Sequence, residues 1–286
     1  MRRHLTASAI RVLSRPSRID LSEPCIIKNA IDHWPAMRER HWHPRRLQKI
    51  YGDRIFEWGV GMHSDTTLLI SFSRFLSRKH PLTRSRCYLF DSTFDTDCPE
   101  LLNDYFIPPL FEFGCHDAPS CHSAPEAQLS PYRWLLVGHP GSGSRLHTDP
   151  PHTSAWNALV YGLKEWVVIQ PDAARDSTSR SQCSALPRAA TSEDAFYTRA
   201  RETSASASLY RWFSKDISRL WRHAHFTAAA SCDASVSLRI MRFTQRPGDI
   251  VYIPCGWQHA VLNRRLSVAV THNFVCPDGR SSATTN

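Results

Sequence analysis

The sequence predicts a mainly β protein with flanking helices, built around a barrel or sandwich of short strands. Short apolar runs separated by Gly- and Pro-containing turns recur over residues 132–170 and 237–275, a spacing typical of antiparallel β architectures. A hydrophobic content of 42% over 286 residues is enough for a sizeable core. No apolar run reaches the roughly 18 residues that a membrane-spanning helix needs, so we expect no transmembrane helix.

The N-terminal part contains helices and strands that we expect to support the barrel. The expected elements are strand 24–31, helix 43–51, strand 54–60, helix 70–78 and strand 87–90. The stretch Asp97-Cys-Pro-Glu100 has the pattern of a capping box with proline in the first turn. It predicts a helix through Leu101, Leu102 and Tyr105. We divide the chain here, into a support region (residues 1–97) and a barrel domain (residues 98–286).

The barrel core is expected over residues 132–275, with one large interruption. The expected core strands are 132–137, 146–149, 155–161, 164–170, 237–243, 250–253 and 266–275. Residues 171–236 form the interruption, where Leu209, Trp212, Phe213 and Ile217 recur at helical spacing. This aromatic stripe is typical of core packing, so we predict a helical insert there.

The strongest functional signal lies in the middle of the core. A Gly-rich turn precedes His147-Thr-Asp149, and Pro254-Cys-Gly-Trp-Gln-His259 supplies a second histidine. Two neutral imidazoles and one carboxylate hold Fe(II) on one triangular face and leave the other positions open. Since side chains alternate along a strand, we expect His147 and Asp149 to point the same way, with His259 joining from another strand. The alternative is a solvated turn followed by an aspartate, because so short a motif arises often by chance.

The order of these motifs resembles the JmjC-domain oxygenases, cupin-fold enzymes that use Fe(II) and 2-oxoglutarate. Within them the chain is most similar to the bifunctional arginine demethylase and lysyl hydroxylase family, over residues 20–276. The matching stretches are Tyr88-Leu-Phe-Asp-Ser92, Pro131-Tyr-Arg-Trp134, Ser154-Ala-Trp-Asn-Ala-Leu159, Arg246-Pro-Gly-Asp249 and Thr271-His-Asn-Phe274. The resemblance implies a double-stranded β-helix, or jelly roll, and identifies residues 98–286 as a JmjC domain.

The resemblance also implies a site for 2-oxoglutarate. An anionic co-substrate in an apolar barrel needs a cation, because burying an unpaired carboxylate costs several kcal/mol or more. Lys164 is the only lysine between residues 130 and 200, although spacing alone fits a surface lysine on an edge strand equally well. By resemblance Lys164 binds the co-substrate, and Asn157, Thr271, Tyr88 and Ser144 form further hydrogen bonds to the co-substrate.

The activity implied is Fe(II)-, 2-oxoglutarate- and O2-dependent hydroxylation of protein side chains. On lysine the product is hydroxylysine, and on N-methylarginine the hydroxylated methyl group leaves as formaldehyde. The resemblance points to protein substrates with basic side chains, on histones or RNA-processing proteins, and to the nucleus. The family relative continues beyond the position of Asn286 with helices that help it dimerise, so we expect a monomer or weak dimer here.

Charge distribution leaves further alternatives open. Eleven Lys or Arg face four Asp or Glu in residues 1–50, within a formal net charge of +9. This basic region could bind RNA or be a solvated surface. Its first eighteen residues carry five arginines and no acid, which is typical of a mitochondrial presequence but also of a basic terminus or a first helix. The nine cysteines form no regular framework, so we expect reduced thiols and an intracellular protein, with cytoplasm and mitochondrion as alternative compartments.

Three other functions therefore compete with the enzyme acting on proteins. The first is a JmjC hydroxylase acting on RNA, and the second is a non-catalytic cupin that binds RNA or protein. The third is a zinc-organised interaction module. Its candidate ligands are Cys98, Cys115, His116, Cys121 and His122. A polar loop is favoured over zinc there, because the segment contains no CxxC pair.

Overall fold

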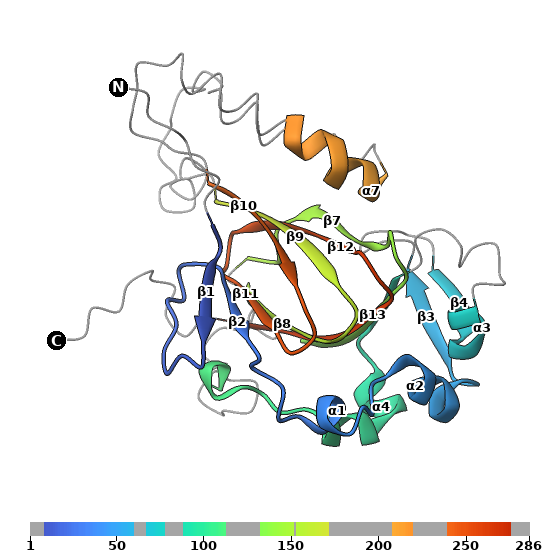
Figure 1. Cartoon of the computed structure of the whole chain (residues 1–286). Coiled ribbons are helices and arrows are strands. Elements are labelled where there is room, and N and C mark those ends of the chain that lie inside the picture. Colours follow the sequence, from blue (N-terminus) through green and yellow to red (C-terminus); the bar gives the residue numbers. More distant parts are fainter. Residues whose placement is uncertain are drawn as a thin grey trace, which may run out of the picture.

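The structure, a computed structural model, describes residues 9–59, 67–77, 88–112, 132–151, 153–171, 208–219 and 239–275. Within these residues two β-sheets face each other and enclose a barrel (Figure 1). The larger sheet has the order β1 (Arg11–Ser14), β2 (Cys25–Lys28), β11 (Ile250–Ile253), β8 (Thr153–Tyr161), β13 (Ser267–Val275), β6 (Arg133–Gly138), β5 (Tyr88–Asp91), β3 (Ile55–Gly59), β4 (Thr67–Ser71). The smaller sheet has the order β10 (Ile240–Gln245), β9 (Lys164–Ile169), β12 (Gln258–Asn263), β7 (Gly143–His147).

The eight strands from β6 to β13 form the core of the barrel. Strands β6, β8, β11 and β13 lie in the larger sheet, and β7, β9, β10 and β12 lie in the smaller one. The chain thus crosses repeatedly between the two sheets, and every pairing among these eight strands is antiparallel. This is the topology of a double-stranded β-helix, which confirms the predicted fold class.

The N-terminal strands extend the larger sheet on both sides of the core. Strand β2 pairs antiparallel with β11, and β5 pairs antiparallel with β6. The Lys28 Nζ atom lies 2.7 Å from the buried Asp249 carboxylate, so an ion pair fixes β2 to the turn before β11. Residues 11–14 form strand β1 beside β2, and a first helix is therefore wrong for this part of the basic segment.

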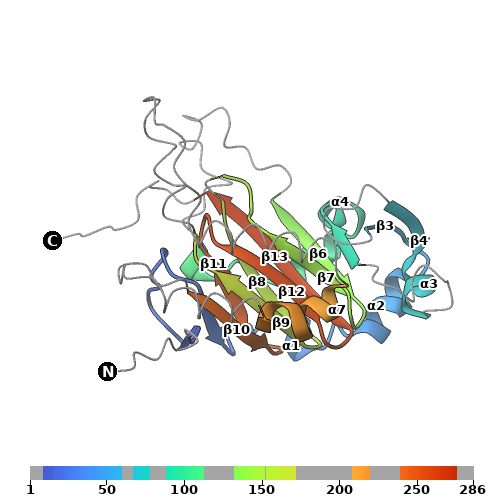
Figure 2. The same ribbon diagram turned by 90° about the horizontal axis from the view of Figure 1, so that it is seen from above.

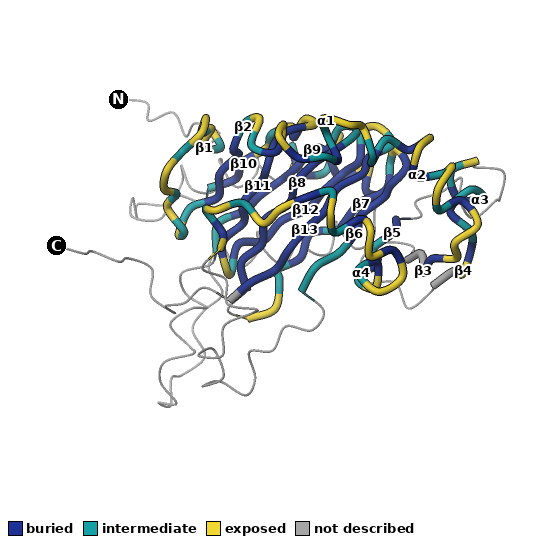
Figure 3. Tube along the Cα trace, turned by 90° about the horizontal axis from the view of Figure 1, so that it is seen from below, coloured by how far each residue is buried: buried dark blue, intermediate teal, exposed yellow. Residues whose placement is uncertain are grey.

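Short helices cover the outer face of the larger sheet. They are α1 (Pro35–Arg38), α2 (Pro44–Tyr51), α3 (Phe72–Ser77), α4 (Phe94–Asp97) and the 3-10 helices Pro99–Asp104 and Pro109–Phe111. Trp34, Trp42 and Phe72 from this layer pack in one apolar cluster with Trp156 and Val270 of the sheet. Figure 3 shows these buried strands beneath a partly exposed helical layer.

A separate helix covers the smaller sheet. Helix α7 (Leu209–Arg211) continues as a π-helical turn, Trp212–Asp216, over β7, β9 and β12 (Figure 2). Leu209, Trp212 and Phe213 pack against Val167 and Leu262 on the outer face of that sheet. The predicted helix in the insert is therefore confirmed where the structure describes it, at residues 208–219, and the rest of residues 172–238 lies outside the described residues.

Two predicted helices differ from the structure. Residues 70 and 71 belong to β4, because Ile70 and Ser71 pair with Phe56 and Ile55, so the predicted 70–78 helix begins only at Phe72. The predicted capping box is wrong as well. The Asp97 carboxylate accepts a hydrogen bond from Thr93 on the preceding turn instead (2.7 Å).

The segment after Asp97 is a tight 3-10 helix without a side-chain cap at Cys98, and Tyr105 is extended at its end. The other expected strands and the 43–51 helix, seen as α2, agree with the structure to within three residues. Among the described residues, no helix is long and apolar enough to cross a membrane.

Candidate metal centre and adjoining pocket

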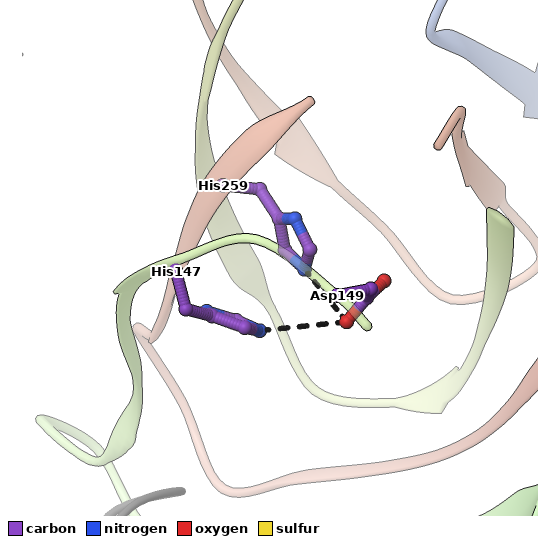
Figure 4. Close-up of side chains that lie close together, drawn as sticks. All are labelled: His147, Asp149 and His259. Carbon is purple, nitrogen blue, oxygen red and sulfur yellow. Dashed lines mark ion pairs between the residues drawn. The ribbon is translucent and has the colours of Figure 1, made fainter. Parts of the chain in front are cut away.

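Two imidazoles and one carboxylate meet between the sheets (Figure 4). His147 is the last residue of β7, and His259 is its cross-strand partner on β12. His259 also pairs with Val168 of β9, and Val168 belongs to an apolar cluster that joins both sheets. Both histidines therefore face the barrel interior, with ring centroids 4.2 Å apart.

The carboxylate comes from the loop that follows β7. Because β7 ends at His147, Asp149 lies beyond the strand, and the expectation that both residues sit on one strand is wrong. Asp149 Oδ1 lies 3.8 Å from His147 Nε2 and 4.0 Å from His259 Nε2. One ligand atom from each residue falls within 4.8 Å of the others, and no second group of three such residues occurs in the described ranges.

Backbone carbonyls orient both imidazoles. The His147 Nδ1 atom lies 2.7 Å from the carbonyl oxygen of Arg145, and His259 Nδ1 lies 3.3 Å from that of Trp257. Because a carbonyl oxygen can only accept, each Nδ1 carries the hydrogen, and the lone pair of each neutral ring is on Nε2. Both Nε2 atoms face Asp149, so the ring nitrogens nearest the carboxylate are the ones able to bind a cation.

This donor set fits Fe(II). Two neutral nitrogens and one carboxylate oxygen on one side of a point form the face that non-haem Fe(II) oxygenases use, with the opposite positions open. Trp166 of β9 lies beside His259, with ring centroids 6.1 Å apart. No sequence motif marks Trp166, although the two-residue alternation Lys164, Trp166, Val168 predicts that it lies on the interior face.

The lysine of the expected pocket is fully buried. Lys164 is 1% exposed and begins β9, on the same face as Trp166 and Val168. Its Nζ atom donates to the hydroxyl of Tyr88 (3.3 Å), and no carboxylate lies within ion-pair distance of it among the described residues. Burial lowers the pKa of Lys164 to about 7, and burial also raises the pKa of Tyr88. The reading of Lys164 as a surface residue is therefore wrong.

Two further expected residues lie opposite each other on neighbouring strands. Asn157 of β8 and Thr271 of β13 are register partners in the larger sheet. The Asn157 side-chain oxygen is buried without a hydrogen-bond partner among the described residues. The Thr271 hydroxyl donates to the carbonyl of Trp156 (2.8 Å), so it would have to exchange this bond to donate to a ligand.

Ser144 is less closely integrated with the other expected pocket residues. It is buried on β7 opposite Val261, which packs between the two sheets. Its side chain makes no hydrogen bond to Lys164, Tyr88, Asn157 or Thr271 within the described structure. The structure thus joins Lys164 to Tyr88 and sets Asn157 beside Thr271, while Ser144 remains separate.

Three residues that no sequence motif indicates, Gly138, Ser142 and Asn263, pack next to Tyr88 and beside Lys164. Gly138 of β6 pairs with Tyr88, and a methyl group there would lie 2.1 Å from Asn263 Nδ2 and 2.8 Å from Tyr88 Cδ2. The Asn263 amide donates to the Ser142 hydroxyl (3.0 Å), and Asn263 is the register partner of Lys164. The close packing against Gly138 is visible only in three dimensions, because no local sequence pattern marks it.

The alternative zinc site can be examined at one of its five candidate ligands, Cys98. Cys98 is completely buried in the helical layer, where burial raises the pKa of its thiol to about 11. A zinc ligand must be a thiolate, so this environment disfavours metal binding at Cys98. The other four candidate ligands, at positions 115, 116, 121 and 122, lie outside the described residues.

Fold and site together define a β-helix barrel with a facial triad of potential metal ligands and a buried lysine. The model of the family described as "Cupin-like domain" matches residues 17–278. The chain belongs to this family, and the expected likeness to the JmjC proteins is confirmed.

Named relatives are similar in sequence over most of this chain. The chain is 29% identical to the bifunctional arginine demethylase and lysyl-hydroxylase psr-1 of Caenorhabditis briggsae, over 88% of this chain and 55% of that protein. It is 29% identical to the lysine-specific demethylase JMJ21 of Arabidopsis thaliana, over 90% of this chain and 23% of that protein. It is 24% identical to the human 2-oxoglutarate and iron-dependent oxygenase JMJD4, over 88% of this chain and 56% of that protein. The chain thus spans between 23% and 56% of the length of these relatives.

Proposed function

We propose that the protein is an Fe(II)- and 2-oxoglutarate-dependent dioxygenase that hydroxylates protein side chains. The observation that carries this proposal is a triad of His147, Asp149 and His259 in the same barrel as a buried lysine that has no carboxylate partner among the described residues. A metal-binding module has no need of a buried ammonium group, whereas a dianionic co-substrate does. The proposal agrees with the printed names of the relatives, which include iron-dependent oxygenases and demethylases.

Each residue has a definite task in this reaction. His147 Nε2, His259 Nε2 and Asp149 would hold one face of the iron and leave the opposite face to co-substrate and O2. Bound iron would supply the redox chemistry that couples decarboxylation of 2-oxoglutarate to succinate and CO2 with insertion of one oxygen atom into a C–H bond. The carbonyls of Arg145 and Trp257 would hold the two imidazoles in the ligating tautomer.

The co-substrate's distal carboxylate would lie against Lys164. A protonated Lys164 and the Tyr88 hydroxyl can both donate to it, and the amide of Asn157 and the hydroxyls of Thr271 and Ser144 are the remaining polar groups that we assign to this pocket. An anion there would raise the pKa of Lys164 back toward its ordinary value, since the opposite charge favours the ammonium form.

An apolar cluster that includes Tyr88 lies on the same inner face of the larger sheet as Asn157 and Thr271, and it would help to exclude water. Tyr88, Leu136, Leu159 and Ala269 form a buried cluster on the inner face of the larger sheet, with Phe90 and Trp134 packed against it. Water exclusion strengthens the lysine–carboxylate attraction and protects a reactive centre from side reactions. The chain's own contribution is therefore an apolar barrel interior that holds a buried cation, Lys164, and three residues able to bind a metal.

For the substrate we propose basic protein side chains, lysine or N-methylarginine, in keeping with the names of the demethylase and lysyl-hydroxylase relatives. We expect the protein to be an intracellular monomer or weak dimer, acting in the nucleus. The cytoplasm and the mitochondrion are the alternative compartments.

The test is product analysis by mass spectrometry. Wild-type protein with Fe(II), 2-oxoglutarate and air is incubated with lysine peptides, N-methylarginine peptides and single-stranded RNA, alongside Asp149→Ala. We expect peptides to gain one oxygen atom or to lose a methyl group with the wild type alone. Oxygen gain by RNA only would favour the RNA hydroxylase, and a protein that binds no iron and yields no product would favour the non-catalytic binding module.

A further inference from the structure

The turn that immediately precedes the His259 strand is held by a loop far away in sequence. Residues 254–257 connect β11 to β12, and the loop Leu21–Glu23 lies directly against them. The indole Nε1 of Trp257 donates to the carbonyl of Ser22 (3.2 Å), and the hydroxyl of Tyr252 donates to the carbonyl of Leu21 (2.9 Å). The separations of these residues along the chain exceed two hundred positions.

An ion pair closes this contact over the indole ring. The Arg239 guanidinium lies over the ring of Trp257, 5.6 Å from its centroid, and Arg239 Nη1 lies 2.7 Å from the Glu23 carboxylate. Trp257 itself is 5% exposed and packs with Ile26 of β2 and Ile253 of β11. The indole is therefore held by a hydrogen bond at its edge, by a cation on its face and by apolar neighbours.

The loop is shaped to present its carbonyl groups. The Asp20 carboxylate accepts from the backbone N–H of Ser22 (2.9 Å) and from its hydroxyl (2.7 Å), and these two bonds lower the pKa of Asp20. The N–H of Glu23 donates to the Asp20 carbonyl (3.3 Å). This local turn leaves the carbonyls of Leu21 and Ser22 available to Tyr252 and Trp257.

The opposite side of the same turn is tied to the strand that follows Asp149. The backbone N–H of Cys255 donates to the Ser154 hydroxyl oxygen (3.0 Å), and this oxygen lies 3.4 Å from the Tyr252 hydroxyl. Ser154 is buried on β8, in the larger sheet. The turn is thus fixed between β8 and the N-terminal loop.

Trp257 is also the residue whose carbonyl accepts from His259 Nδ1 (3.3 Å). We propose that the loop Leu21–Glu23 is a positioning element of the metal centre, which orients His259 through the indole and the carbonyl of Trp257. Trp257 is a positioning residue, because it acts on the metal through His259 and does not ligate. The inference rests on the proposed metal site and adds to it a support far from the ligands in sequence.

The test measures metal affinity, not turnover. Co(II) binding to the full chain is followed by calorimetry and by the ligand-field absorption of the bound ion, which reports coordination geometry. Trp257→Phe keeps an aromatic ring and removes the indole N–H. We expect the Co(II) dissociation constant to rise about 10- to 100-fold, the range for losing a group that orients a metal-bound histidine, with an altered Co(II) spectrum.

A matched control separates positioning from general stability. Trp42 is also buried, and its indole donates to the Asp104 carboxylate (3.0 Å) in the helical layer outside the barrel. We expect Trp42→Phe to lower the melting temperature of the metal-free protein without changing Co(II) affinity or the spectrum. Trp257→Phe binding Co(II) with the wild-type constant and spectrum would overturn the inference.

If Trp257→Phe does not fold, a second variant, Tyr252→Phe, tests the positioning role instead. Tyr252→Phe removes one hydroxyl, and with it the bond to Leu21, at nearly unchanged volume. It should weaken Co(II) binding in the same direction, and unchanged binding contradicts the positioning role. A wild-type chain that binds no Co(II) refutes the metal centre and the proposed function together, so the two failures are distinguishable.

Discussion

At the scale of single residues, the site depends on two unusual environments. The imidazoles of His147 and His259 are fixed by backbone carbonyls, so that their Nε2 atoms face Asp149. Lys164 is buried with one hydroxyl group as its hydrogen-bond partner. A buried ammonium group without a counter-ion destabilises the folded protein, and such groups concentrate at functional sites. We therefore expect mutations at Lys164 to affect stability and ligand binding in opposite directions.

Replacing Lys164 by methionine tests this opposition. Lys164→Met removes the charge at similar volume, so we expect the ligand-free protein to melt at a higher temperature. Loss of a charge-assisted hydrogen bond, worth about 1.5–3 kcal/mol, should weaken 2-oxoglutarate binding about 10- to 100-fold. Calorimetry and thermal melts on the same samples give both quantities, and Lys28→Met, which alters an ion pair on β2, serves as the control. A Lys164→Met protein that binds 2-oxoglutarate normally would remove Lys164 from the pocket.

The pH dependence of stability follows from the same residue. The pKa of Lys164 is about 7 in the folded chain and about 10.4 when unfolded. Between these values the unfolded state binds the extra proton, so the free energy of unfolding from this group rises with pH from about 7 to about 10. We expect this rise in denaturant melts of ligand-free wild type and its absence in Lys164→Met. Equal pH profiles for the two proteins would show that Lys164 has an ordinary pKa.

The pH dependence of ligand binding has the opposite sign. Only the protonated lysine pairs with a carboxylate, so 2-oxoglutarate affinity should be constant below pH 7 and fall above it. The expected limit is about tenfold per pH unit, because the binding form is then a decreasing fraction of the protein. Calorimetric titrations between pH 6 and 9 measure this slope, and a flat profile contradicts it.

At the scale of elements, the site depends on how closely β7 approaches β12. Gly143 begins β7 with φ of +147°, and a methyl group there would lie 2.0 Å from the carbonyl oxygen of Val261. The His147–His259 pair lies on the same two strands, beyond a register irregularity between His259 and Val261. A shift of one strand against the other would therefore change the geometry of the proposed metal ligands.

Gly141 and Gly143, which lie at the turn between β6 and β7, allow a matched comparison of backbone strain with strain plus a steric clash. We expect Gly143→Ala to lower the free energy of unfolding by more than the 1–3 kcal/mol of backbone strain alone, since it also clashes with β12. Gly141 also has positive φ (+88°), but a methyl group there meets nothing within 4 Å. Gly141→Ala should therefore lower the free energy of unfolding by the strain cost only and leave Co(II) binding unchanged, whereas Gly143→Ala should also weaken Co(II) binding. Equal destabilisation in urea melts would show that the strand contact is not close.

At the scale of the whole molecule, both sheets and a distant N-terminal loop contribute to one centre. His147, His259 and Lys164 come from the smaller sheet, while Asn157, Thr271 and Tyr88 come from the larger one. No isolated strand contains the site, so the proposed metal binding requires the folded barrel. A ligand that binds only the folded state stabilises it by mass action.

Metal binding should accordingly raise thermal stability. With free Co(II) at about 100 times its dissociation constant, the stabilisation should be about 2.7 kcal/mol. Asp149→Ala lacks the carboxylate ligand, and we expect its melting temperature to be insensitive to Co(II). Scanning calorimetry of both proteins, with and without Co(II), makes the comparison. An equal shift in wild type and Asp149→Ala would place the metal elsewhere.

The sequence predicted the fold class and most strands, because apolar alternation and glycine turns are local signals. Local patterns failed where tertiary contacts decide, as in β4, where pairing with β3 takes Ile70 and Ser71 from the predicted helix. Likewise, the Asp97 carboxylate accepts a hydrogen bond from the Thr93 hydroxyl, earlier in the chain, and does not cap the helix that follows. The spacing His147-x-Asp149 suggested the triad, although Asp149 lies past the end of the strand.

The surroundings of the site were less predictable. The roles expected for Lys164, Asn157, Thr271, Tyr88 and Ser144 came from resemblance, since nothing local distinguishes a buried lysine from a surface one. The supports of the site, such as Gly138 against Asn263 or Ser22 against Trp257, join residues that are far apart in the chain. These contacts depend on the topology of the barrel and could not be found from spacing.

The central claim is that the triad and Lys164 together support turnover of 2-oxoglutarate. The most direct measurement is succinate release after anaerobic Fe(II) loading and admission of air, for wild type, His147→Ala and Lys164→Met. We predict that the wild type releases succinate, that His147→Ala releases none, and that Lys164→Met regains part of its rate at high 2-oxoglutarate. A wild type that binds Fe(II) and 2-oxoglutarate but releases no succinate with any peptide or RNA, or a His147→Ala protein as active as wild type, would contradict the account.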